Sequence, residues 1–136
     1  MQLLDLVFGG AFMTISQAVV TMLVAFIVWY GYQKNLFLKK LAFTTLFVEI
    51  ILVAVFLSYQ TLNGHVVREV HEEAYYAFTG MVHGLLSLYA LAHAGLAFVR
   101  ARKSFAAGQN YFREHSRRSM VLVAAWVLSL VTGLGL

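Results

Sequence analysis

The stretch that decides the fold is AYYAFTGMVHGLLSLYALAHAGLAFV, residues 74–99, which contains twenty-six residues and no formal charge. A helix rises 1.5 Å per residue, so a helix of this length crosses a hydrocarbon layer of about 30 Å with room for tilt. Two histidines, His83 and His93, would then lie inside the bilayer, where an imidazole needs a polar partner. They are the first candidates for a functional site.

The composition is that of an integral membrane protein. Hydrophobic residues make up 61% of the chain and charged residues 12%, and the mean hydropathy is +0.77. A soluble domain carries about 25% charged residues. The N-terminus MQLLDLVFGGAF has no basic segment before its apolar run, so we expect no cleavable signal there. The chain contains no cysteine, which excludes disulfides, thiolate chemistry and iron–sulfur ligation.

Three further apolar runs accompany the first one. We expect four spans, near residues 7–32, 41–62, 74–99 and 119–136. Short connections join successive spans, so neighbouring helices must run in opposite directions. The sequence therefore predicts an all-α fold, an integral membrane four-helix up-down bundle that forms a single membrane domain over residues 1–136.

The distribution of Lys and Arg predicts the orientation of the bundle. They concentrate in the first connection, near residues 33–40, and in the third, near residues 100–118, whereas the second connection has Arg68 alone. By the positive-inside rule, the first and third connections face the cytoplasm of a cytoplasmic membrane and both termini lie outside. Topology and anionic lipid head groups account for the net charge of +4, so we expect the lipid bilayer and no nucleic acid as a partner.

A buried carboxyl and a buried imidazole are expected at nearly the same depth. Glu49 is eight residues from the inner end of the second span, about 12 Å, and His93 is six residues from that of the third, about 9 Å. Pairing reduces the free-energy cost of burying two such groups. We therefore expect Glu49 and His93 to form a buried polar pair, with Trp126 near that level.

His83 is expected in a different environment from His93. It lies ten residues away, about 15 Å along the helix and rotated by about 80°, so the two imidazoles cannot bind one metal ion. A hydrogen bond to a hydroxyl across a helix interface would account for His83 without any further function. Gly80, Gly84 and Ser87 give that helix a small-residue face suited to close packing. Polar groups expected at the depth of His83 are Gln17, Ser58, Tyr59, Ser129 and Thr132.

The outer loop carries the acidic cluster HVVREVHEE at residues 65–73. If this segment is helical, His65, Glu69 and Glu72 share a face that could hold a divalent metal ion, with Glu73 beside them. The alternative is a solvated acidic turn in which Arg68 pairs with the nearby carboxylates.

The end of the chain resembles a known family. The residues that carry the resemblance are His115-Ser116-Arg117-Arg118, Trp126, Ser129 and Thr132-Gly133, together with His83 in the third span. They resemble a small four-span bacterial and archaeal membrane family catalogued as domain of unknown function 420, which includes maturation factors of haem–copper oxidases. The resemblance implies a role beside a terminal oxidase.

Three functions are compatible with these features. The first is a non-catalytic accessory or assembly subunit that binds other membrane subunits of a respiratory complex of the haem–copper oxidase type. The second is a membrane cytochrome that binds haem b and passes electrons along a respiratory chain, with His83, His93 and His115 as candidate ligands. His93 and His115 would meet only if His115 folds into the first turn of the last helix, and a haem at His83 would need a partner subunit or a single axial ligand.

The third is a quinone- or proton-handling subunit that uses Glu49 and His93. The sequence shows no nucleophile–base pair and no phosphate-binding loop, so we do not expect an enzyme acting by itself.

Overall fold

The computed structural model describes residues 11–63 and 70–134, with side chains for residues 12–58 and 78–134. The described chain consists of helices and their connections. The elements are α2 (Ala11–Lys34), α3 (Lys39–Asn63), α4 (Val70–Ala106), α5 (Tyr111–Glu114) and α6 (Ser116–Leu134). Helices α2, α3, α4 and α6 are each long and apolar enough to cross a membrane, so the chain is a multi-pass membrane protein.

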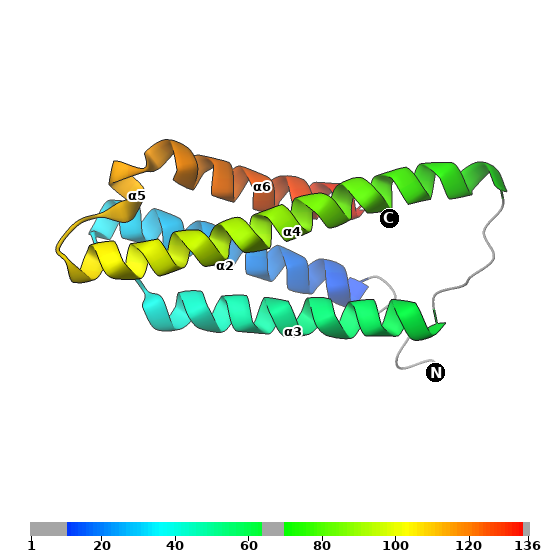
Figure 1. Cartoon of the computed structure of the whole chain (residues 1–136), viewed down its shortest axis with the longest axis horizontal. Coiled ribbons are helices and arrows are strands. Elements are labelled where there is room, and N and C mark those ends of the chain that lie inside the picture. The colour runs from blue at the N-terminus through cyan, green and yellow to red at the C-terminus, as the bar shows by residue number, and fades with distance from the viewer. Residues whose placement is uncertain (1–10, 64–69, 135–136) are drawn as a thin grey trace.

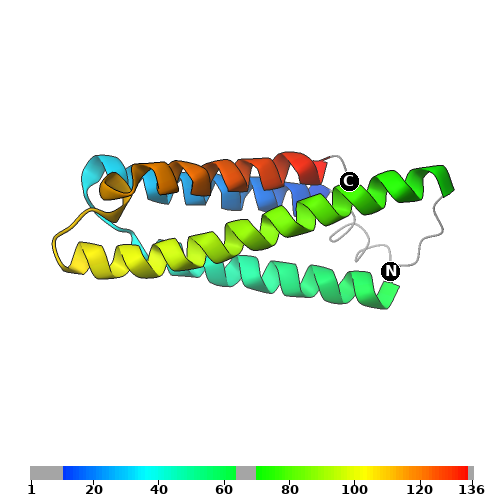
Figure 2. The same cartoon turned by 45° about the horizontal axis from the view of Figure 1, so that its top comes forward.

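The four long helices form an up-down bundle (Figures 1 and 2). Each packs against its neighbours in the chain, and α6 closes the ring by packing against α2. The prediction of an all-α four-helix membrane bundle is therefore confirmed. The start of α2 and the end of α6 lie at the same end of the bundle, and α4 extends beyond its neighbours there (Figure 1).

The ends of two helices differ from the predicted spans. Helix α4 continues past Val99 to Ala106, so the first three basic residues of the expected third connection are helical. The remaining connection turns at Gly108, whose φ of +79° suits a residue without a Cβ. Helix α6 begins at Ser116, immediately after the short helix α5. We refer to this end of the molecule, which also carries the α2–α3 connection, as the basic end.

A cluster of aromatic rings fills the core at the basic end. Phe37, in the α2–α3 connection, lies 5.9 Å from Phe98, 5.8 Å from Phe105 and 6.0 Å from Phe112 between ring centroids. Phe37, Phe98 and Phe112 are buried. Since these rings come from three different segments, the cluster fixes both connections of the basic end against the bundle.

Helix α5 is fixed to the end of α2 by hydrogen bonds. Asn110 caps α5 by accepting a bond from the backbone N–H of Arg113, and its amide donates to the carbonyl of Gly31 at 2.8 Å and to the Asn35 side chain at 2.9 Å. Arg113 donates to the carbonyls of Tyr32 and Gln33, at the end of α2. These bonds satisfy carbonyls that have no partner within α2 and set the position at which α6 begins.

Candidate functional site

His83 joins α4 to α6 through hydrogen bonds. Its Nδ1 donates to the carbonyl of Ser129 at 2.8 Å and lies 3.2 Å from the hydroxyl of Thr132. Ser87, one turn along α4, shares a 2.6 Å hydrogen bond with the Ser129 hydroxyl. Both Ser129 and Thr132 were predicted as neighbours of His83. This arrangement matches the helix-packing alternative for His83.

The His83 ring occupies the space above Gly133. A Cβ atom on Gly133 would come within 2.8 Å of the Cε1 atom of His83, which is closer than two carbon atoms can approach. The glycine of the Thr132-Gly133 pair therefore leaves room for a flat ring between α4 and α6.

Glu49 is buried in the bundle and bonded to Gln17. The Gln17 amide donates to Oε1 of Glu49 at 2.8 Å, whereas Oε2 is buried without a hydrogen-bond partner. We expected Gln17 near His83, and it instead lies at the level of Glu49. The Nε1 atom of Trp126 is also buried without a partner.

No hydrogen bond joins Glu49 to His93 among the described residues, so the expected buried pair is not formed as such. The depth estimate considered distance along the helices and left out rotation about them. Glu49 points towards α2, where it meets Gln17, whereas His93 lines a cavity between α4 and α6. The quinone- or proton-handling hypothesis loses the pairing on which it was based.

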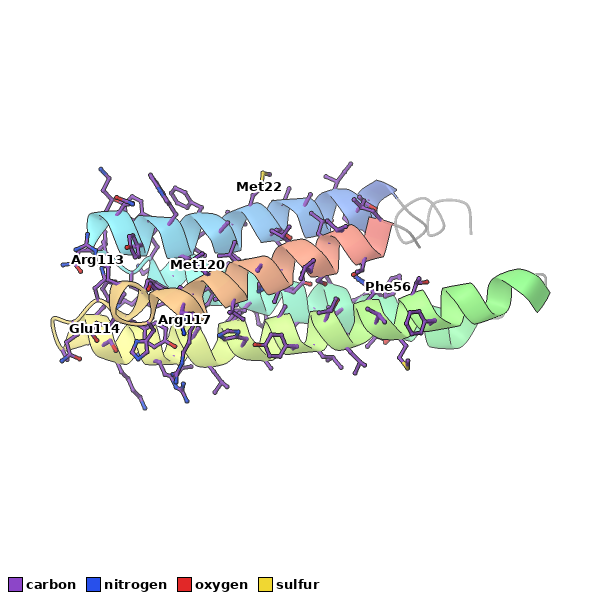
Figure 3. All side chains as sticks on the ribbon, turned by 90° about the horizontal axis from the view of Figure 1, so that it is seen from above. Met22, Phe56, Arg113, Glu114, Arg117 and Met120 are labelled. Carbon is purple, nitrogen blue, oxygen red and sulfur yellow. The ribbon has the colours of Figure 1, made fainter. Side chains whose placement is uncertain are left out.

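His93 and His115 line one cavity at the basic end. This open cavity has a volume of about 700 Å³ and lies between α4, α5 and the start of α6. The residues that line it are Tyr89, His93, Leu96, Ala97 and Arg100 of α4, Tyr111 and Glu114 of α5, His115, and Ser116, Arg117, Arg118 and Val121 of α6. Figure 3 shows Arg117 beside α4 and Arg113 on the side of α2. We expected His93 and His115 to meet only if His115 folds into the first turn of the last helix. His115 instead caps the end of α5 and directly precedes Ser116, the first residue of α6.

The local contacts of His115 determine which ring nitrogen is free. Its Nδ1 lies 3.2 Å from the carbonyl of Tyr111, and its ring stacks on the Tyr111 ring at 4.5 Å between centroids. A carbonyl only accepts, so this hydrogen bond requires a proton on Nδ1, and Nε2 is then the nitrogen that can bind a ligand. A histidine that ligates a metal through Nε2 is usually oriented by such an Nδ1–H bond.

His93 is partly buried on the other wall of the cavity. Its ring packs edge-on against Tyr89 with 5.5 Å between centroids. Its Nδ1 atom is buried and has no hydrogen-bond partner. A ligand in the cavity would therefore have to bind the other ring nitrogen, Nε2, because the buried Nδ1 does not open to the cavity.

A second cavity of about 510 Å³ adjoins the first and extends it towards the end of α4. It is lined by Arg100, Lys103, Ser104, Tyr111, His115 and Arg118. Four of these residues, Arg100, Tyr111, His115 and Arg118, also line the first cavity. The two cavities therefore form one groove, which runs from His93 to Lys103.

Sequence reasoning missed Tyr89, Tyr111 and Asn110 as parts of this region. Asn110 could have been identified, because an asparagine after Gly108 and before Tyr-Phe-Arg is typical of a helix N-cap. The two tyrosines carry no local signal, since their position depends on how α4 and α5 pack.

The metal site expected in the outer loop falls outside the described part of the chain. His65 and Glu69 lie in the gap between residues 63 and 70, and the side chain of Glu72 is likewise not described. Among the residues that were described, no group of three His, Asp or Glu side chains is gathered that could hold a metal ion.

Comparison of the chain with protein-family models, with curated proteins and with solved structures found no match.

Proposed function

We propose that this chain is a subunit of a respiratory chain in the cytoplasmic membrane that binds haem b, with His93 and His115 as the two iron ligands. The observation that carries the proposal is that both histidines line the same cavity, from different helical segments. Two imidazoles on opposite sides of a haem are the ligands expected in a membrane b-type cytochrome. The resemblance to a family that includes oxidase maturation factors supports a place beside a terminal oxidase.

The chemistry of the lining residues fits such a ligand. The Tyr111 carbonyl holds His115 in the tautomer that leaves Nε2 free, and the His93 ring lines the same cavity. Leu96, Ala97 and Val121 provide apolar walls for a flat macrocycle. Haem b, when bound, would supply one-electron transfer, and these residues would position it.

The test is an absorption spectrum of the purified protein after addition of haem b and reduction with dithionite. We expect the sharp bands of a six-coordinate, two-histidine haem, and we expect His93→Ala and His115→Ala each to abolish them. His83→Ala is the matched control, because His83 bonds Ser129 and does not line the cavity. Circular dichroism checks that each variant is folded.

Two results would contradict the proposal. One is a two-histidine haem spectrum that persists in the His93→Ala variant and also in the His115→Ala variant. The other is a two-histidine spectrum that disappears in a folded His83→Ala variant, which would place the haem at the other end of the α4–α6 interface.

The second candidate is an accessory or assembly subunit that holds no cofactor and binds other membrane subunits. One observation favours it: Gly80 and Gly84 lie one turn apart on α4, and a Cβ atom on either would meet nothing within 4 Å. Such a face allows close approach by a helix from another subunit. Under this function, Gly80→Leu/Gly84→Leu should abolish co-purification with oxidase subunits, while Gly95→Leu, which also has open space around it, should not.

A further inference from the structure

Four cationic side chains line the groove between α4 and α6 without a partner among the described side chains. They are Arg100 and Lys103 of α4 and Arg117 and Arg118 of α6, and we call them the basic rim. Within residues 12–58 and 78–134, none of them forms a hydrogen bond or an ion pair. Arg113, only a few residues away, is by contrast fully engaged with the end of α2.

The charges of the basic rim are not balanced locally. Glu114 is the one carboxylate among the residues that line the two cavities. Four like charges around one groove repel each other, and the repulsion is larger beside the apolar part of a membrane than in bulk water. A bound anion would convert this repulsion into charge-assisted hydrogen bonds, and Arg is well suited to bidentate contacts with a carboxylate.

The cations of the basic rim share the groove with the two histidines. Arg100 follows His93 by seven residues and Lys103 follows it by ten, which corresponds to about 10 and 15 Å along the helix. Three of the four cations, Arg100, Arg117 and Arg118, line the cavity that also holds His93 and His115, and Lys103 extends the cationic lining towards the end of α4. A haem carries two carboxylates at one edge of its ring, and these are anions of the kind that such a lining would bind.

We propose that the basic rim binds the two propionate carboxylates of the haem. This inference rests on the proposed function. A phospholipid phosphate is the competing anion, because basic grooves between membrane helices also bind lipid head groups. The haem is favoured because three of the four rim cations line the same cavity as both histidines.

The experiment compares three porphyrins on the full-length protein in nanodiscs of phosphatidylcholine. They are haem b, its dimethyl ester, in which both propionates are uncharged, and protoporphyrin IX, which lacks iron. We expect haem b to bind at least about tenfold more tightly than the ester, the equivalent of one good charge-assisted contact. Protoporphyrin IX, followed by its fluorescence, should also bind, because the rim does not need the metal.

The variant Arg100→Gln/Arg118→Gln should weaken binding of haem b and protoporphyrin IX but leave binding of the ester unchanged. Arg102→Gln is the matched control, because Arg102 is exposed on the same helix and lines neither cavity. It should bind all three porphyrins as the unmodified chain does.

Three results would overturn the assignment of the rim. They are equal binding of haem b and its ester, failure to bind protoporphyrin IX, and loss of the difference between haem b and its ester when phosphatidylglycerol replaces phosphatidylcholine. The last result would assign the rim to lipid phosphate. Failure of the proposed function is recognised separately, because the two-histidine spectrum would then be absent even though protoporphyrin IX still bound in a rim-dependent way.

Discussion

Glu49 illustrates how one buried side chain depends on a single partner. It is 4% exposed, and one of its oxygens accepts a hydrogen bond from Gln17 while the other has no partner. Removing one member of a buried polar pair leaves the other unsatisfied, which costs more than the pair contributes. The two residues therefore have to be considered together.

We predict that Gln17→Leu destabilises the protein by about 1–3 kcal/mol, because neither carboxyl oxygen of Glu49 would then have a partner in the bundle. Glu49→Gln should cost less, since its amide oxygen can still accept from Gln17. The double variant Gln17→Leu/Glu49→Leu should recover most of the loss, because no polar group remains unpaired. Chemical unfolding in detergent micelles, followed by circular dichroism, measures all three.

A double variant as unstable as Gln17→Leu alone would contradict this prediction. It would mean that Glu49 contributes through another contact. A loss of electron transfer in a stable Glu49→Gln variant would instead support the proton-handling hypothesis.

Single side chains also show what the sequence could and could not predict. Depth along each helix was read correctly enough to place His83 beside Ser129 and Thr132. The direction in which each side chain points around its helix could not be predicted, because the exposed sides of a membrane helix are as apolar as its buried sides and give no periodic signal. Glu49 and His93 were therefore paired by level although they face different helices.

At the scale of the elements, the contact between α4 and α6 is built on small residues. Gly133 accommodates the His83 ring, and Ser87 and Ser129 share a short hydrogen bond. Van der Waals packing and interhelical hydrogen bonds are what hold helices together in lipid, since the hydrophobic effect does not act between them.

We predict that Gly133→Ala weakens this contact by about 1–3 kcal/mol, because the new methyl group must displace the His83 ring and lengthen its bond to Ser129. Gly95→Ala on α4 is the control, since nothing lies within 4 Å of its Cβ position. It should be neutral, or stabilising by up to about 1 kcal/mol through helix propensity. Thermal unfolding of both variants measures the difference, and equal effects would show that the His83 ring moves aside without cost.

The short helix α5 contacts both the end of α2 and the cavity. Its N-cap Asn110 bonds the end of α2, and its Tyr111 carbonyl orients His115. Phe112 lies against Gly31, where a Cβ atom would come within 2.5 Å of the ring. A change at the far side of α5 should therefore reach the cavity through His115.

We predict that Asn110→Ala lowers stability by about 1–2 kcal/mol and also weakens haem binding, although Asn110 does not line the cavity. The reason is that α5 loses its cap and its bonds to Gly31 and Asn35. Gln109→Ala, at an exposed neighbouring position, should change neither quantity. Thermal unfolding and a haem titration test the two effects. Unchanged haem binding in a destabilised Asn110→Ala variant would show that the position of α5 does not affect the cavity.

At the scale of the whole molecule, nine of the ten Lys and Arg residues lie at the basic end, and Arg68 is the tenth. The four apolar runs predicted four membrane crossings. The positions of the Lys and Arg residues predicted that the first and third connections lie at the same end of the bundle. The sequence could not predict the groove at that end, because its walls come from α4, α5 and α6, which are brought together by tertiary contacts such as the packing of Phe37, Phe98 and Phe112.

We predict that the basic end faces the cytoplasm, because translocating a connection with this many positive charges is unfavourable. The chain has no cysteine, so single substitutions report on sidedness without a background. A membrane-impermeant maleimide should label Leu134→Cys on intact cells, and Lys39→Cys and Gln109→Cys only after lysis. Labelling of Gln109→Cys on intact cells would contradict this orientation and place the groove between α4 and α6 on the outer face. In that case the proposed haem and its electron partner would have to reach the groove from outside, so the same labelling experiment decides from which side of the membrane the cavity is loaded.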